Sequence, residues 1–172
     1  AGLKTLAVLA AVFGVVGLFS TPSAAGGLWL YEVGTADIGL ASAGYGARAQ
    51  DAATVLTNPA GMTRLAGSQL LVGGQLLYGA LEFADDGRTT TSGGNGGNAV
   101  GFLPAASLFY THQLSPKATF GFGVFSNFGL GLEYDEDWAG RYYAQKAALI
   151  GMSAMPAIAF KVSDTVSLGV AL

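Results

Sequence analysis

Alternation between bulky apolar residues and small or polar residues is the dominant pattern of the chain. It is clearest between Ala118 and Leu132, where Phe, Val and Leu gather at even positions and Gly, Thr and Asn at odd ones. A period of two places successive side chains on opposite faces of a strand. The pattern predicts a β-strand between two different environments, with Phe128, Leu130 and Leu132 on its bulky face.

The same alternation recurs elsewhere, and we predict about five strands. One further run, near residues 100–114, is less regular, with bulky side chains on both faces. Two of the predicted strands exceed the roughly 9–11 residues that cross a bilayer. The bulky positions of the other runs are Leu70, Val72, Leu76 and Tyr78, then Tyr142, Ala148, Ile150, Met152, Ile158 and Phe160, then Val166, Leu168 and Val170.

The connections between the predicted strands alternate in length. A long loop rich in Gly, Thr, Ser and Asn spans 85–98, and a medium acidic loop spans 133–141. Tight turns lie at Ser115-Pro116 and Ser163-Asp164. Long loops on one side and short turns on the other are typical of an outer-membrane meander with periplasmic turns. The sequence therefore predicts an all-β fold, a transmembrane antiparallel β-barrel.

A secreted β-sandwich is the alternative fold, with a surface-binding or adhesion function. Its inward faces also alternate, but its outward faces should carry charged residues. Here the second face carries Gly, Ser, Gln and Ala in place of Lys and Glu. This composition favours the barrel, whose outward side chains are apolar because lipid surrounds them.

Composition narrows the classes further. The 172 residues are 51 % apolar and 11 % charged, with 27 Gly, no Cys and a net charge of −3. These values exclude a disordered tail, a disulfide scaffold and a basic nucleic-acid binder. Part of the hydrophobicity belongs to residues 1–25, which have the charged start, apolar core and small-residue end of a secretory signal peptide. We expect the mature chain to begin at Gly26 and the protein to leave the cytoplasm.

Residues 26–66 lack a sustained strand period and are rich in small residues. Asp51 is placed to cap a short helical stretch at 52–56. Asn58 is placed to cap the next turn, with Pro59 at the first helical position. We expect a partly helical plug, or hatch, inside the lumen, followed by barrel strands over 67–172.

Three stretches together resemble the FadL/TodX family of outer-membrane transporters for long-chain fatty acids and other hydrophobic compounds. They are ASAGYGARAQDAATVLTNPAGMTRL, SNFGLGLEYDEDWAGRYYA and MPAIAFKVSDTVSLGVAL. The resemblance runs from about Gly26 to Leu172. It implies a fourteen-stranded barrel plugged by an N-terminal hatch. It also implies that apolar ligands leave sideways into the outer leaflet, through a gap made by an inward kink in the third strand.

The resemblance carries over to particular residues. Asn127, Phe128 and Gly129 fall at the kink of the third strand, predicted here over 117–134, and Asn127 is expected on the lumenal face. Asn58, Pro59 and Ala60 correspond to the hatch motif that faces the gap. Leu28, Leu30 and Val33 match the start of the hatch, which contributes to the ligand pocket. On the residues alone, the same positions fit an ordinary strand glycine, a helix cap and packing residues.

The expected function is passive outer-membrane transport, without a cofactor and without enzymatic activity. The partners would be a hydrophobic small molecule and outer-membrane lipid, with no nucleic acid, and the full-length protein would be monomeric. His112 has no Asp, Cys or second His at ligand spacing, so we expect neither a metal nor a catalytic role. A lipid-modifying enzyme, the other alternative, would need a Ser/His pair elsewhere.

About five strands are too few for a closed wall. Single-chain barrels begin at about eight strands. Two open sheet edges would face hydrocarbon with unpaired backbone groups. We therefore expect the sequence to be the N-terminal part of a longer protein.

Overall fold

The computed structural model describes residues 33–172. The expected signal peptide and the candidate pocket residues Leu28 and Leu30 lie outside this range. Three short helices precede five strands: η1 (Ala36–Leu40), α2 (Thr54–Thr57), η2 (Pro59–Arg64), β1 (Ser68–Gly79), β2 (Gly101–Ser115), β3 (Ala118–Glu133), β4 (Lys146–Lys161) and β5 (Ser167–Ala171). No helix within the described range has the length and apolar character needed to cross a membrane.

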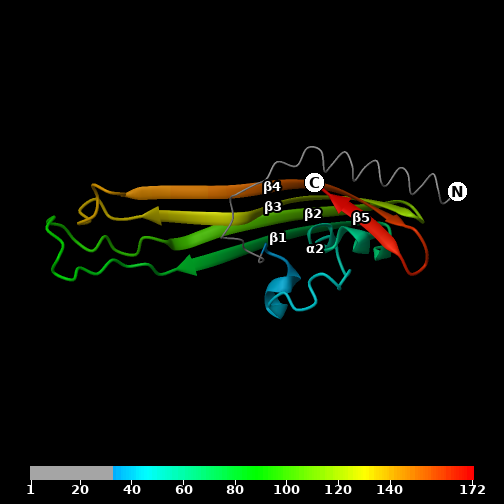
Figure 1. Ribbon diagram of the computed structural model, residues 1–172, viewed down its shortest axis with the longest axis horizontal. Coiled ribbons are helices and arrows are strands. Elements are labelled where there is room, and N and C mark those ends of the chain that lie inside the picture. Colours follow the sequence, from blue (N-terminus) through cyan, green and yellow to red (C-terminus); the bar gives the residue numbers. More distant parts are fainter. Residues whose placement is uncertain (1–32) are drawn as a thin grey trace.

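The strands form one sheet in chain order, with every neighbouring pair antiparallel. Long loops over 80–100 and 134–145 meet at one end of the sheet, and tight turns close the other end (Figure 1). The predicted meander and its alternating connections are confirmed.

Among the described residues, segments outside the strands pack on one face of the sheet and leave the other exposed. The N-terminal segment, residues 33–66, packs against one face, which we call the inner face, in the half nearest the tight turns (Figure 1). On the opposite, outer face of β1, Leu70, Val72 and Leu76 are 65–69 % exposed. Phe109 of β2 points inward and is fully buried. The outer face is thus a broad apolar surface of the kind that lipid covers.

The inner face is shaped to receive the N-terminal segment. Val55 and Met62 are fully buried and contact β3 where Gly121 leaves room for them. The rings of Phe109 and Phe125 stack beside them, with centroids 5.6 Å apart. Small residues on the inner face thus allow the N-terminal segment to approach the sheet closely.

Two strand boundaries differ from the predicted ones. β4 begins at Lys146, whereas Tyr142 lies in the preceding loop and is 78 % exposed. Hydrogen bonds from the N–H groups of Arg141 and Tyr143 to carbonyls three residues earlier keep this stretch in turns. β5 begins at Ser167, because Val166 is held in the preceding turn by Ser163.

The predicted facing of the third strand holds for Asn127, which contacts inward-facing Ser153, and is wrong beyond it. The register between β3 and β4 shifts there: Ser126 pairs with Met152, but Phe128 pairs with Gly151, leaving Asn127 as an extra residue. Such a bulge moves every later side chain to the opposite face. A Cβ placed on inward-facing Gly151 would lie 3.1 Å from the Phe128 Cβ, which puts both on one face. Phe128, Leu130 and Leu132 therefore belong to the inner face.

The approach of the N-terminal segment to β1 yields a stability prediction. A methyl group at Gly73 would collide with the carbonyl oxygen of Gly34 and lie 2.7 Å from the hydroxyl of Ser107. The change Gly73→Ala should lower the free energy of unfolding by about 1–3 kcal/mol, as overpacking does. Urea unfolding of the full-length protein in lipid vesicles measures this loss.

Gly74→Ala is the matched control, because a methyl group at Gly74 meets nothing within 4 Å. Equal midpoints for the two variants would show that the N-terminal segment does not press on β1.

Candidate functional site: an unpaired seam between two strands

The ladder between β2 and β3 ends partway along the strands. Paired residues run from the tight turn up to Ser107 and Phe125. On either side the ladders continue: β1 pairs with β2 as far as Gly101, and β3 pairs with β4 as far as Glu133. We call the unpaired stretch between 101–106 of β2 and 126–132 of β3 the seam. It is a break within an otherwise continuous part of the described sheet.

Pro104 stands on the β2 side of the seam. The Gln113 N–H donates to the carbonyl of Gly67, on the β1 side. Backbone groups of a strand point to alternate neighbours, so the even-numbered residues of β2 turn theirs toward β3. Pro104 therefore presents a ring to the seam where another residue would present an N–H donor. This feature was not used in the sequence-based prediction, although a proline inside a strand pattern marks an edge.

The bulge stands on the β3 side of the seam. The Ser126 hydroxyl lies 3.0 Å from the Gly151 carbonyl oxygen and 3.2 Å from that of Phe128. The Ser153 hydroxyl lies 3.4 Å from Asn127 Oδ1. A bulge disrupts the local ladder and bends its strand. Asn127, Phe128 and Gly129 thus lie at the level where the pairing with β2 is lost.

The outer end of the seam is closed again by the loops. The Glu133 N–H donates to the Ala99 carbonyl at 2.8 Å. Beyond it, Gly94 exchanges backbone hydrogen bonds with Asp137 and Ala139, at 2.9 and 3.0 Å. The Arg141 guanidinium adds a 2.9 Å bond to the Ser92 carbonyl. The two long loops thereby join the β1–β2 hairpin to the β3–β4 hairpin above the gap.

Aromatic packing fills this junction of the loops. The ring of Tyr134 stacks on the ring system of Trp138 with centroids 3.7 Å apart, and Phe83 meets Trp138 edge-on at 5.9 Å. Trp138 is 9 % exposed. Gly96 has a positive φ of 78°, and a Cβ there would lie 2.7 Å from Tyr134 and 2.9 Å from Trp138. The junction is therefore tightly packed, and it borders the seam at the loop end of the sheet.

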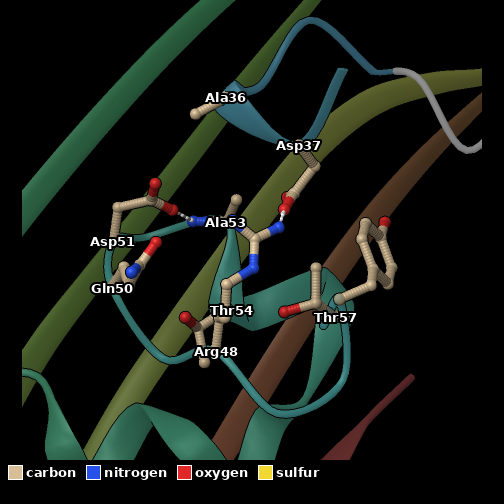
Figure 2. A pocket seen from close by; sticks show the side chains of 9 residues that line it. Ala36, Asp37, Arg48, Gln50, Asp51, Ala53, Thr54 and Thr57 are labelled. Atoms are coloured by element: carbon tan, nitrogen blue, oxygen red, sulfur yellow. Dashed lines mark hydrogen bonds and ion pairs between the residues drawn. The ribbon is translucent and has the colours of Figure 1, made fainter. Parts of the chain in front are cut away.

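The N-terminal segment borders the seam on the side of the tight turns. Arg48 pairs with Asp37 and so ties the loop before α2 to η1 (Figure 2). Asp51 accepts a 2.9 Å hydrogen bond from the Ala53 N–H in the turn leading into α2, whereas α2 itself begins at Thr54 and has no side-chain cap. The cavity beside these residues is only about 20 Å³, lined by Ala36, Asp37, Tyr45, Arg48, Gln50, Asp51, Ala53, Thr54 and Thr57. It has room for about one water molecule and excludes an alkyl chain.

The Asn58-Pro59-Ala60 motif lies at the β5 side of the sheet. Pro59 starts η2 as predicted, but the Asn58 side chain does not cap that helix. Its amide instead donates to the Gly46 carbonyl at 2.8 Å. The backbone of Pro59 and Ala60 presses on Gly169 of β5. The structure thus places this motif against β5, whereas Asn127 contacts β4.

The contacts of Val33 and His112 are those of structural residues. Val33 is 3 % exposed and belongs to the buried core under the sheet. The His112 Nδ1 lies 2.7 Å from the Ser68 hydroxyl, near the tight-turn end of β2. Among residues 33–172 no cluster of His, Cys, Asp and Glu side chains is suited to hold a metal ion.

Exposed charges mark both ends of the sheet. In the long loop, a backbone N–H two residues on lowers the pKa of Asp85, and the Arg88 guanidinium lowers that of Asp86. At the opposite end, Lys161 lies 2.9 Å from Asp164 and lowers the pKa of that carboxyl. These carboxylates stay ionised at neutral pH, so the apolar outer face is bordered by charge at each end. Charge at both rims of an apolar band fits a sheet that crosses a bilayer.

The fold and its apolar outer face define a section of an outer-membrane β-barrel wall with an N-terminal segment packed on its inner side. The sequence profile described as outer membrane protein transport protein (OMPP1/FadL/TodX) matches residues 16–172. The chain therefore belongs to the OMPP1/FadL/TodX family of the bacterial outer membrane. The resemblance identified from the sequence is confirmed.

Individual relatives agree with this assignment. The Long-chain fatty acid transport protein of Escherichia coli is 28 % identical over 169 residues, covering 96 % of this chain and 37 % of that protein. Outer membrane protein P1 of Haemophilus influenzae is 30 % identical over 154 residues, covering 81 % and 34 %. A crystal structure of a Pseudomonas aeruginosa FadL homologue superimposes with a TM-score of 0.61 at 21 % identity, covering 85 % of this chain and 37 % of that one. The chain thus spans about a third of the length of these relatives.

The loop junction yields a second prediction. Gly96→Ala should loosen the junction, because the new methyl group enters the space of Tyr134 and Trp138 at 2.7 and 2.9 Å. We expect a loss of about 1–3 kcal/mol in the stability of the junction. Limited proteolysis of intact cells measures it as faster cleavage within 80–100 and 134–145.

Gly87→Ala controls for backbone strain in this experiment. Gly87 has a φ of 82°, close to that of Gly96, but a Cβ there meets nothing within 4 Å. Both variants carry the penalty of Ala at a positive φ. If Gly87→Ala accelerated cleavage as much as Gly96→Ala, the aromatic packing would have no part in joining the loops.

Proposed function

We propose that the full-length protein, as a monomer, passes hydrophobic compounds such as long-chain fatty acids across the outer membrane. The family's description supports transport at the outer membrane, and the name of the Escherichia coli relative, long-chain fatty acid transport protein, supports this substrate class. Apolar ligands bind by burial, at about 25 cal/mol per Å² of apolar surface. Movement down a concentration gradient then needs no energy source and no cofactor.

In this proposal the seam between β2 and β3 is the lateral exit into the outer leaflet. The observation that carries it is the end of the β2–β3 ladder at Ser107 and Phe125, while both flanking ladders continue. Asn127, Phe128 and Gly129 form the β3 border of this exit. Pro104 forms part of the β2 border.

Residues 26–66 act as the hatch in the same proposal. Their described part covers the inner face below the seam, and the cavity beside Asp37 and Arg48 is too small for an alkyl chain. A larger cavity of about 520 Å³ lies between η2 and the turn before β5, and its lining is mostly polar, with Asn58, Thr63, Arg64, Lys161, Asp164, Thr165 and Ser167. In this proposal an apolar ligand travels above the segment, and a shift of the residues around Val33 connects the lumen with the seam. The motif Asn58-Pro59-Ala60 contributes by holding the hatch to β5 through the contact at Gly169.

An uptake assay tests the proposed function. Cells that lack their own transporter and carry the full-length protein should take up labelled fatty acids, alkanes or monoaromatics faster than cells without it. The panel also identifies the preferred class. Uptake equal to that of empty cells for every class, with the protein present as a heat-modifiable outer-membrane band, would overturn the proposal.

Pro104→Ala tests the lateral exit. The substitution restores an N–H donor toward β3, so the ladder gains a hydrogen bond worth about 0.5–1.5 kcal/mol and the seam narrows. We expect slower uptake of the transported compound at unchanged protein level. Rates are compared in the same transporter-deficient cells.

Pro156→Ala serves as the matched control. Pro156 lies in β4 and turns its backbone toward β5, because its carbonyl accepts from the Leu172 N–H at 3.1 Å. This change leaves the seam as it is, and uptake should stay near that of the unchanged protein. Slowing by Pro156→Ala and not by Pro104→Ala would place the exit elsewhere.

A further inference from the structure

Ser126 is a polar residue on a face that is otherwise bulky and apolar. It pairs with Met152 of β4, so it shares the outer face with Phe120, Phe122 and Val124. In a barrel wall this face meets hydrocarbon, where a hydroxyl without a partner is unfavourable. The position therefore calls for a local hydrogen-bond acceptor.

The bulge supplies two such acceptors. The Ser126 Oγ lies 3.0 Å from the carbonyl oxygen of Gly151 and 3.2 Å from that of Phe128. These carbonyls flank the extra residue, Asn127, where the regular ladder is interrupted. A carbonyl without a partner costs several kcal/mol in hydrocarbon, since no water replaces the lost bond. The hydroxyl and the bulge thus satisfy each other.

We propose that Ser126 is the positioning residue that holds this bulge and thereby turns Phe128, Leu130 and Leu132 inward, where they line the path of an apolar ligand. The lining role rests on the function proposed above. The positioning role stands on the hydrogen bonds and the register alone.

The inner face of β3 changes character at the bulge. Below it, the inward positions are Thr119, Gly121, Gly123 and Phe125, and the N-terminal segment and Phe109 pack against this part. Above it, the inward positions are the three bulky residues Phe128, Leu130 and Leu132, with Leu149 paired opposite Leu130. The outward positions there are Gly129 and Gly131; a Cβ at Gly129 would meet nothing within 4 Å, whereas one at Gly131 would lie 3.6 Å from the Leu103 side chain across the seam.

This arrangement suits an alkyl chain. Apolar side chains follow the inner side of β3 from the loops to the seam, which offers continuous apolar contact to a long hydrocarbon. Without the bulge the same three side chains would face lipid, and glycines would face the path. Ser126 thus decides which of the two surfaces the ligand meets.

Cysteine labelling tests the orientation directly. The 172 residues contain no Cys, so each introduced thiol is the single one in this part of the protein. Leu130→Cys and Gly129→Cys are made in the full-length protein and treated, in isolated outer membranes, with a water-soluble maleimide. We expect Leu130→Cys to react and Gly129→Cys to be protected by lipid. The opposite pattern would overturn the inward orientation.

The role of the hydroxyl is tested in the same two backgrounds. Ser126→Val removes the hydroxyl at nearly the shape of Ser126→Thr, which keeps it. Loss of one hydrogen bond corresponds to a change of about tenfold in the labelling ratio of the two positions. We expect that change with Ser126→Val and the original ratio with Ser126→Thr.

An unchanged ratio in Ser126→Val would refute the positioning role of Ser126. Labelling is scored only on the heat-modifiable, folded band, so a lower yield does not affect the result. Because labelling needs no transport, it separates this inference from the proposed function. Correct labelling with no uptake of any compound would refute only the lining role.

Discussion

Hydrocarbon offers no hydrogen-bond partner to a backbone N–H or C=O group, and most of this structure follows from that constraint. Strands β1 to β5 pair in chain order, so that nearly every interior backbone group finds a neighbour. The seam between β2 and β3 interrupts this pairing inside the described sheet. It is bounded by the ladder ending at Ser107 and Phe125 and by the bond between Ala99 and Glu133. Pro104, Ser126 and the junction of the long loops, all next to the seam, reduce the number of backbone N–H and C=O groups that are left unpaired.

Each side of the seam meets the constraint differently. On β2, Pro104 has no N–H group, so one donor that would face the gap is absent. On β3, the Ser126 hydroxyl lies within hydrogen-bond distance of the Phe128 and Gly151 carbonyls beside the bulge. The aromatic junction around Trp138 then keeps the two hairpins together above the gap. A wall can thus be opened locally without unravelling the rest of the ladder.

The sequence predicted the parts of the fold that depend on regular periodicity. Alternation located the strands and, in β1, the outward side chains, and loop lengths gave the direction of the meander. Alternation failed beyond Asn127, because one inserted residue inverts the faces without disturbing the pattern itself. Bulky residues at even positions looked the same on both sides of the bulge. Pro104 was the available signal for an unpaired strand border, since proline is confined to edges and bulges.

Helix caps were predicted with less success, because side-chain partners depend on tertiary packing. Asp51 accepts from a backbone N–H close to it in sequence, as short-range logic predicts. Asn58 instead donates to Gly46, twelve residues away, because the loop carrying Gly46 folds back over η2. The structural and functional interpretations of the candidate site residues also differ from one residue to the next. Val33 packs in the core, whereas Asn127 occupies a bulge that ordinary strand pairing does not require.

The glycines show how one residue type serves opposite purposes on the two faces. Gly73, Gly121 and Gly169 lie on the inner face, where backbone or side chains of the N-terminal segment occupy the space of a missing Cβ. Their smallness is used for packing. Beyond the bulge, Gly129 faces outward with open space beside it. A glycine there leaves the lipid side of the seam unobstructed, while the bulky side chains of the same strand lie inside. The extra residue at Asn127 reverses which face each later side chain of β3 occupies. As a result, the bulky side chains provide apolar contact in the lumen, and Gly129 leaves open space on the lipid side of the seam.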